Sequence, residues 1–246
     1  MYVRRRKGHS STVGQYPASL EGGWDLFGFN VTTLIANIPA LMIGFAFHEY
    51  AHAWAADRLG DPTPRSQGRL TLNPLVHLDL FGTLMAFLYQ FGWAKPVMTN
   101  PQYYKGNKLR GRMLVSLAGP IMNLLIAFVT LLLWYLTMHW IHGSEWSSVI
   151  ALVFKSTVLM NLGLGVFNLL PIPPLDGFGV LGGILPEHLA HRLLALEQYG
   201  MIILIILLFT DILGTVLFPA VNGIAFVYQT ILALVLSPIL GQMWLN

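Results

Sequence analysis

Five long apolar segments lie along the chain. They cover residues 31–57, 113–138, 148–171, 199–218 and 219–241. A helix needs about 20 apolar residues to cross the hydrocarbon core of a bilayer, so each segment predicts a membrane-spanning helix. A sixth apolar segment, residues 78–91, is too short to cross comfortably as a straight helix, which favours a re-entrant element.

The composition supports an integral membrane protein. Hydrophobic residues make up 55% of the chain and charged residues 10%, whereas a soluble domain has about 25% charged residues. We therefore expect an all-α polytopic transmembrane helical bundle of about five to six membrane segments, with a short re-entrant or β-like cytoplasmic element. Residues 25–246 form this transmembrane domain, and residues 1–24 form a polar, basic N-terminal tail.

Cationic residues concentrate in two connections and predict the orientation in the cell membrane. Three arginines lie between residues 58 and 69, and five lysines and arginines lie between residues 95 and 112. The positive-inside rule places both connections in the cytoplasm, so residues 78–91 must enter and leave from that side. The net charge is only +3 and its cations lie beside apolar segments, so topology explains it better than a nucleic-acid partner does.

The first apolar segment contains the pentapeptide His48-Glu49-Tyr50-Ala51-His52. Residues four apart share one face of a helix, so the two imidazoles can bind one metal ion while Glu49 orients and deprotonates a water molecule. Such residues are costly in a spanning helix and persist mainly where a site needs them. The alternative interpretation is a set of polar residues packed inside a helical bundle.

The end of the apolar segment 148–171 suggests a third metal ligand. Pro171, Pro173 and Pro174 cannot continue a helix, so the chain unwinds just before Asp176. Hydrolytic zinc sites commonly have three protein ligands and keep one position for water, and this chain has no cysteine. Asp176 is therefore the best candidate to join the two histidines. The alternative is that Asp176 only caps the following helix.

An unusual amide, Asn123, lies in the apolar sequence Ala118-Gly119-Pro120-Ile121-Met122-Asn123. An asparagine in such a segment usually finds a partner. Two interpretations remain open for it: a hydrogen bond between packed helices, or a functional role. With the predicted orientation, this segment, His48 and Asp176 all reach the cytoplasmic end of the bundle.

Taken together, these motifs resemble the site-2 protease family of intramembrane zinc metalloproteases. The resemblance rests on the sequences HEYAH, AGPIMN and NLLPIPPLDG, the last at residues 168–177. Residues 60–64, 68–74 and 92–97 are similar to small prokaryotic members that lack PDZ domains.

The resemblance implies one Zn²⁺ per chain, bound by His48, His52 and Asp176. It implies that Glu49 is the general base and acid, and that Asn123 helps to hold the substrate or the oxyanion. The expected substrate is a transmembrane protein, cut within or beside its membrane span, with the active site toward the cytoplasmic side. Residues 93–99 are a candidate edge strand for the opened peptide.

Two other classes of function use similar residues. A metal transporter would place several equivalent polar residues along the membrane normal, and a catalytically inactive membrane scaffold would not need the intact motif. This chain concentrates its polar residues at one end and places Glu49 beside a ligand, which favours an enzyme.

Overall fold

The computed structural model describes residues 31–89, 92–141 and 146–240, and its regular structure is helical. The predicted tail, residues 1–24, lies outside the described residues. The helices in chain order are α1 (Val31–Arg58), α2 (Thr63–Ser66), α3 (Pro74–His77), α4 (Leu80–Tyr89), η1 (Pro101–Tyr103), α5 (Lys108–Ile141), α6 (Ser147–Asn168), α7 (Asp176–Ile184), α8 (Glu187–Leu194), η2 (Ala195–Tyr199), α9 (Gly200–Leu208) and α10 (Ile212–Leu240).

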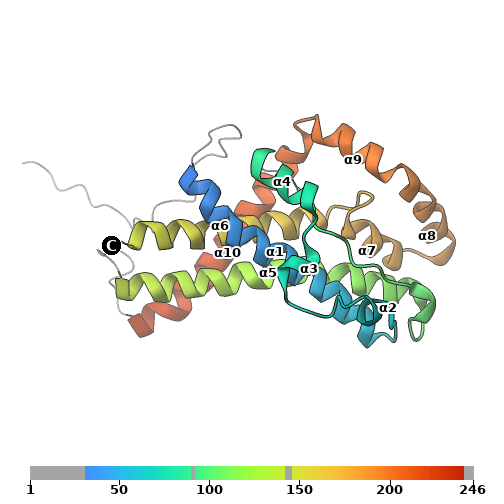
Figure 1. The fold of residues 1–246 in the computed structure, drawn as a ribbon, viewed down its shortest axis with the longest axis horizontal. Helices are drawn as coiled ribbons and strands as arrows, with labels where there is room; N and C mark the ends of the chain where they lie inside the picture. The colour runs from blue at the N-terminus through green and yellow to red at the C-terminus, as the bar shows by residue number, and fades with distance from the viewer. Residues whose placement is uncertain (1–30, 90–91, 142–145, 241–246) are drawn as a thin grey trace, which may run out of the picture.

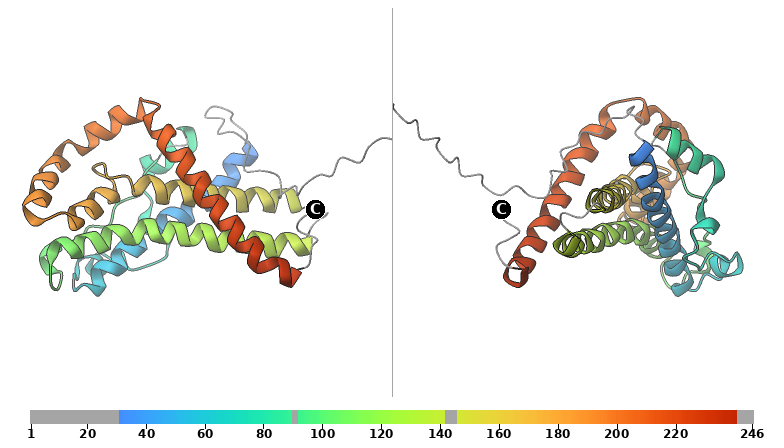
Figure 2. Two further views of the ribbon diagram at one scale, coloured as in Figure 1. Left: turned by 180° about the vertical axis from the view of Figure 1, so that it is seen from behind. Right: turned by 60° about the vertical axis from the view of Figure 1, so that its left-hand side comes forward.

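An antiparallel pair of long helices, α5 and α6, forms the centre of the bundle (Figure 1). Helix α1 packs on one side of this pair and α10 crosses the other side (Figure 2). Small and branched side chains fill the interface of α5, α6 and α10: Ala127, Leu131, Val158, Leu162, Val166, Val221, Ala225 and Leu232. Small residues allow the close helix approach on which association in a bilayer depends.

The predicted all-α membrane bundle is confirmed. Within the described residues, four stretches are long and apolar enough to cross a membrane: Lys108–Met138, Ser147–Asn168, Glu187–Leu208 and Ile212–Pro238. Helix α1, with 28 residues, is also long enough, but its second half carries His48, Glu49 and His52, which reduce its mean hydropathy. The number of long segments is thus close to the five to six expected.

The predicted boundary between residues 218 and 219 is wrong. The chain turns instead at residues 209–211, and Pro219 lies inside α10. The turn coincides with the polar pair Thr210 and Asp211, which interrupts an otherwise continuous apolar sequence. Proline is tolerated inside membrane helices because neighbouring groups satisfy the freed carbonyl. Pro219 therefore does not end α10.

The short apolar segment returns to the place where it starts. Helix α4 has 10 residues and is about 15 Å long, half the thickness of a hydrocarbon core. Leu78 and Ala94, on either side of it, form an antiparallel bridge, and the Lys95 N–H donates to the His77 carbonyl (2.8 Å). This bridge is the β-like element of the part of the chain that the structure describes, and it supports the re-entrant interpretation.

The two cationic connections lie side by side. The Lys105 N–H donates to the Leu59 carbonyl (2.8 Å), and the Arg69 guanidinium donates to the Lys95 carbonyl. Both connections therefore belong to one end of the bundle, together with the start of α5 and with α8 (Figure 1).

This arrangement predicts the labelling pattern of single cysteines in the cysteine-free chain. Gln67→Cys and Gln102→Cys, both at exposed positions, should react with a membrane-impermeant maleimide from the same side of sealed vesicles. Ser148→Cys, exposed at the opposite end of α6, should react from the other side. Labelling of the first two from opposite sides would show that the chain between them crosses the membrane.

Candidate metal centre

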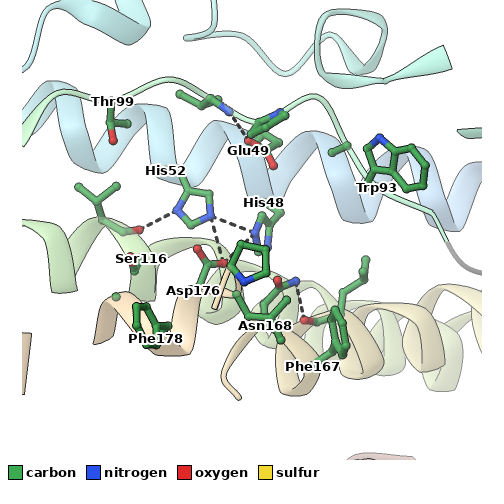
Figure 3. Close-up of a pocket in the computed structure, with 18 of the residues that line it drawn as sticks. His48, Glu49, His52, Trp93, Thr99, Ser116, Phe167, Asn168, Asp176 and Phe178 are labelled. Atoms are coloured by element: carbon green, nitrogen blue, oxygen red, sulfur yellow. Dashed lines mark hydrogen bonds and ion pairs between the residues drawn. The ribbon is translucent and has the colours of Figure 1, made fainter. Parts of the chain in front are cut away.

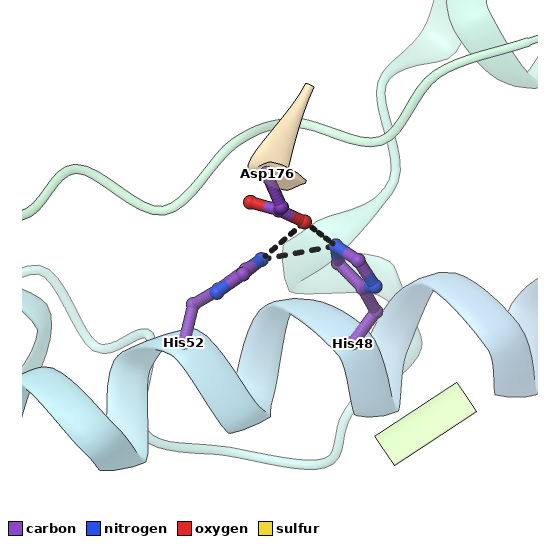
Figure 4. Close-up of side chains that lie close together, drawn as sticks. All are labelled: His48, His52 and Asp176. Atoms are coloured by element: carbon purple, nitrogen blue, oxygen red, sulfur yellow. Dashed lines mark hydrogen bonds and ion pairs between the residues drawn. The ribbon is translucent and has the colours of Figure 1, made fainter. Parts of the chain in front are cut away.

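Two histidines of α1 and the first residue of α7 meet inside the bundle (Figure 4). His48 Nε2 and His52 Nε2 are 2.9 Å apart. Asp176 Oδ2 lies 3.1 Å from His48 Nε2 and 3.3 Å from His52 Nε2. The structure thus brings together the three residues that the sequence singled out as candidate metal ligands.

The break between α6 and α7 explains why Asp176 reaches the histidines. Helix α6 ends at Asn168, and the proline-rich stretch after it lets the chain turn back before α7 begins. Gly177 is needed there, because a Cβ atom at this position would overlap the Leu169 carbonyl. The N-cap of α7 is Leu175 and makes no side-chain cap bond, so the interpretation of Asp176 as a helix cap is wrong.

The hydrogen bonds behind the imidazoles define their tautomers. His52 Nδ1 lies 2.7 Å from the Val115 carbonyl, which can only accept, so Nδ1 carries the proton. His48 Nδ1 lies 2.6 Å from Asn123 Oδ1. The amide of Asn123 is oriented by its Nδ2, which donates to the Gly44 carbonyl (3.1 Å). In the neutral form that binds a metal, both imidazoles would therefore present the Nε2 lone pair toward the aspartate.

Three acceptor atoms facing one another repel unless a cation lies between them. The Oδ2 atom of Asp176 is buried and accepts no hydrogen bond from the described residues. Ligand atoms at tetrahedral positions around zinc lie about 3.3 Å apart, close to the three separations given above. Two imidazole nitrogens and one carboxylate oxygen are a donor set that fits zinc.

Asn123 lies behind His48 and not at the cavity. It is fully buried, and its Nδ2 donates to Asn161 Oδ1 (2.9 Å) as well as to Gly44. Asn161 in turn donates to the Thr157 carbonyl (2.9 Å). This is the interhelical hydrogen bond that was one of the two open interpretations. In this structure the Asn123 amide orients His48, and its expected contact with the substrate or the oxyanion stays a prediction.

A cavity of about 840 Å³ opens beside the three residues (Figure 3). Glu49 lines it, and its Oε2 accepts a hydrogen bond from the Val97 N–H (2.8 Å). The opposite side is apolar and comes from α9: Met201, Leu204, Ile205 and Leu208. The cavity therefore combines a polar centre with an apolar wall.

Several polar residues of the cavity were not assigned a role from the sequence, among them Arg112, Glu197 and Asn168. Arg112 and Glu197 form an ion pair (2.6 Å) across it, and Asn168 lines it from the end of α6. No local pattern links Arg112 to Glu197, because they lie on different elements far apart in the chain. Asn168 could have been noticed as an amide at the end of an apolar helix.

Gly119 of α5 packs directly against the imidazoles. A Cβ atom at this position would lie 2.5 Å from His52 Nε2 and 2.7 Å from His48 Nε2. The glycine therefore leaves the space in which the three ligand atoms meet.

The chain was compared with known proteins. The model of Peptidase family M50 matches residues 36–140 and 135–210. A Bacillus subtilis protein named "Putative zinc metalloprotease YwhC" is 40% identical over 190 residues, which cover 76% of this chain and 85% of that protein. A Mycolicibacterium smegmatis protein named "Putative zinc metalloprotease Rip2" is 33% identical over 198 residues, which cover 78% of this chain and 73% of that protein. No solved structure matches.

The packing of Gly119 predicts a selective loss of metal. Gly119→Ala should reduce zinc affinity about 10- to 100-fold, the cost typical of disturbing the surroundings of metal ligands. Alanine is a better helix former than glycine, so a weakened helix cannot cause this loss. Gly163→Ala in α6, where a Cβ meets nothing within 4 Å, is the matched control. Equal zinc affinities of the two variants would contradict the steric argument.

Proposed function

The chain belongs to peptidase family M50, and we propose that it is a zinc metalloprotease that hydrolyses peptide bonds within or beside membrane-spanning segments of other proteins. The family match confirms the resemblance to site-2 proteases. The observation that carries the proposal is the meeting of two imidazole lone pairs and one carboxylate oxygen beside the Glu49 carboxylate.

His48, His52 and Asp176 would hold one zinc ion per chain. Zinc bound there supplies a Lewis acid that polarises the scissile carbonyl and favours ionisation of water near neutral pH. The protein orients the ligands from behind: the Asn123 amide fixes the His48 ring, and the Val115 carbonyl fixes the His52 ring. Such outer contacts fix the tautomer and make the imidazoles better ligands.

Glu49 is the proposed proton carrier. It follows His48 directly, lines the same cavity, and is held at Oε2 by the Val97 N–H. The other oxygen, Oε1, is the one that we propose takes a proton from the attacking water. The same carboxyl group can then pass that proton to the leaving amine.

The surroundings of the cavity support an apolar, membrane-embedded substrate. Its α9 wall belongs to the candidate span Glu187–Leu208, so an apolar segment could reach the site without leaving the bilayer. A substrate helix must open locally before cleavage, because its amides are hydrogen-bonded within the helix. Residues 93–99 lie along the cavity and could contact the opened chain.

The cation distribution supports a cytoplasmic active site. Residues 58–69 and 95–112 carry eight of the 14 lysines and arginines, and these two stretches lie at one end of the bundle. The candidate zinc ligands lie toward that end. By the positive-inside rule this end faces the cytoplasm.

Metal transport is the less suitable alternative. A transport path needs polar residues at several depths. Within the described ranges, one group of three or more candidate ligands is found, and it is His48, His52 and Asp176. The carboxylate of Glu49 lines the cavity but does not belong to that group, which fits a proton carrier better than a transit site.

Removal of the proton carrier tests the enzymatic role. Glu49→Gln should lower cleavage of a model transmembrane peptide about 10²- to 10⁴-fold while zinc content stays at one per chain, because the amide keeps the shape but loses the base. Glu187→Gln, at an exposed carboxylate of α8, should cleave normally. Native cleavage should stop with a chelator and return with zinc. Undiminished turnover by the Glu49 variant would show that another group carries the proton.

Replacement of Asp176 tests the ligand set. Asp176→Asn should weaken zinc binding by more than the roughly 10- to 100-fold that loss of an outer contact costs, since the charge and the ligand oxygen are both altered. Asp211→Asn, at an exposed position outside the cavity, should bind zinc like the native protein. Zinc titration of the purified proteins measures both. Native affinity in the Asp176 variant would remove this residue from the site.

A further inference from the structure

An extended segment, residues 95–100, passes over α1 directly above Glu49 (Figure 3, between Trp93 and Thr99). It contains no helix and is joined to the rest of the protein by individual hydrogen bonds. At its centre the Val97 N–H donates to Glu49 Oε2 (2.8 Å). A hydrogen bond to an ionised carboxylate is among the stronger ones in proteins, so the position of this segment decides how Glu49 is held.

A buried arginine fixes the first end of the segment. Arg69 is 5% exposed, and its two terminal nitrogens donate to the Val76 carbonyl (2.7 Å) and to the Lys95 carbonyl. The Lys95 N–H also donates to the His77 carbonyl. Burial lowers the pKa of Arg69, and the negative charge of Glu49 acts in the opposite direction. A buried guanidinium is costly unless its donors are used. Here the two terminal nitrogens bind the segment to the chain before α4, while Nε has no partner among the described residues.

A buried aspartate fixes the second end. Asp61 is fully buried, and its Oδ2 accepts from the Asn100 N–H (2.6 Å) while its Oδ1 accepts from the Thr63 N–H (2.9 Å). Two buried charges of opposite sign, both from the connection after α1, thus hold Lys95 and Asn100. Val97 lies between these two points.

We propose that Arg69 and Asp61 are positioning residues for the reaction: they hold residues 95–100 so that the Val97 N–H fixes one oxygen of Glu49 and leaves the other for the proton. The inference rests on the proposed role of Glu49 as proton carrier. A general base must lie within hydrogen-bond reach of the proton that it takes, and a fixed carboxylate needs no reorientation when the substrate arrives.

Removal of the Val97 N–H tests the proposal. In Val97→Pro the donor is lost, while an extended segment tolerates proline. We expect kcat for a model transmembrane peptide to fall about 10- to 100-fold, as for a misplaced catalytic group, with KM within threefold (~0.5 log unit) of the native value and zinc content unchanged.

Two controls separate the N–H from other effects of the change. Val97→Ala keeps the N–H and removes most of the side chain, and Met98→Pro places the same ring at a neighbouring position whose N–H makes no hydrogen bond within the described residues. Both keep the Val97 N–H, so both should lower kcat less than Val97→Pro does. Equal losses in Met98→Pro and Val97→Pro would overturn the proposal, and so would native or increased kcat in Val97→Pro.

Arg69 gives a second, independent variant. Arg69→Lys keeps the charge but loses the paired donors, so kcat should fall with KM and zinc content near native, as in Val97→Pro. In the double variant, the two losses should not multiply, because both act through the same hydrogen bond to Glu49. Multiplicative losses would show that Arg69 acts by another route.

If the native protein itself fails to cleave in a zinc-dependent way, the proposed function fails. Native cleavage together with normal Val97→Pro activity refutes only this inference.

Discussion

The mutual repulsion of three acceptor atoms is the constraint on which the site depends. Both imidazoles use Nδ1 for contacts with the protein, so their Nε2 atoms and the Asp176 oxygen face one another beside the cavity. Without a cation this arrangement is unfavourable, and with one it is a ligand set. Helices α1, α5 and α7 are therefore placed so that one cation can satisfy all three.

The helix packing around the site serves to keep that space open and its ligands oriented. Gly119 of α5 and Gly177 of α7 allow backbone to approach where any side chain would collide. Asn123 and Asn161 use their amides between α1, α5 and α6. In a bilayer, polar side chains buried in this way must find partners within the protein, so the same hydrogen bonds join the helices and orient His48.

The connection after α1 provides a second layer around the site. It contains irregular backbone at the edge of the bundle, which is tolerated where it is covered by protein or lines a cavity. Two of its buried charges, Asp61 and Arg69, bind backbone groups of the segment beside Glu49. The short helix α4 leaves and returns between these contacts, so its apolar residues can face lipid without moving Glu49.

The sequence by itself determined the long apolar helices, the two histidines on one helix face and the unwinding before Asp176, because these follow from local periodicity, spacing and the backbone chemistry of proline. It predicted the boundary near residue 218 wrongly, since the sequence from residue 199 to 241 is almost continuously apolar and is interrupted only briefly at Thr210 and Asp211. Only the tertiary structure decided which partner Asn123 takes, that Arg112 meets Glu197, and that the Val97 N–H reaches Glu49. Each of these contacts joins residues far apart in the chain, and their pairing depends on how the helices pack rather than on any pattern within one segment.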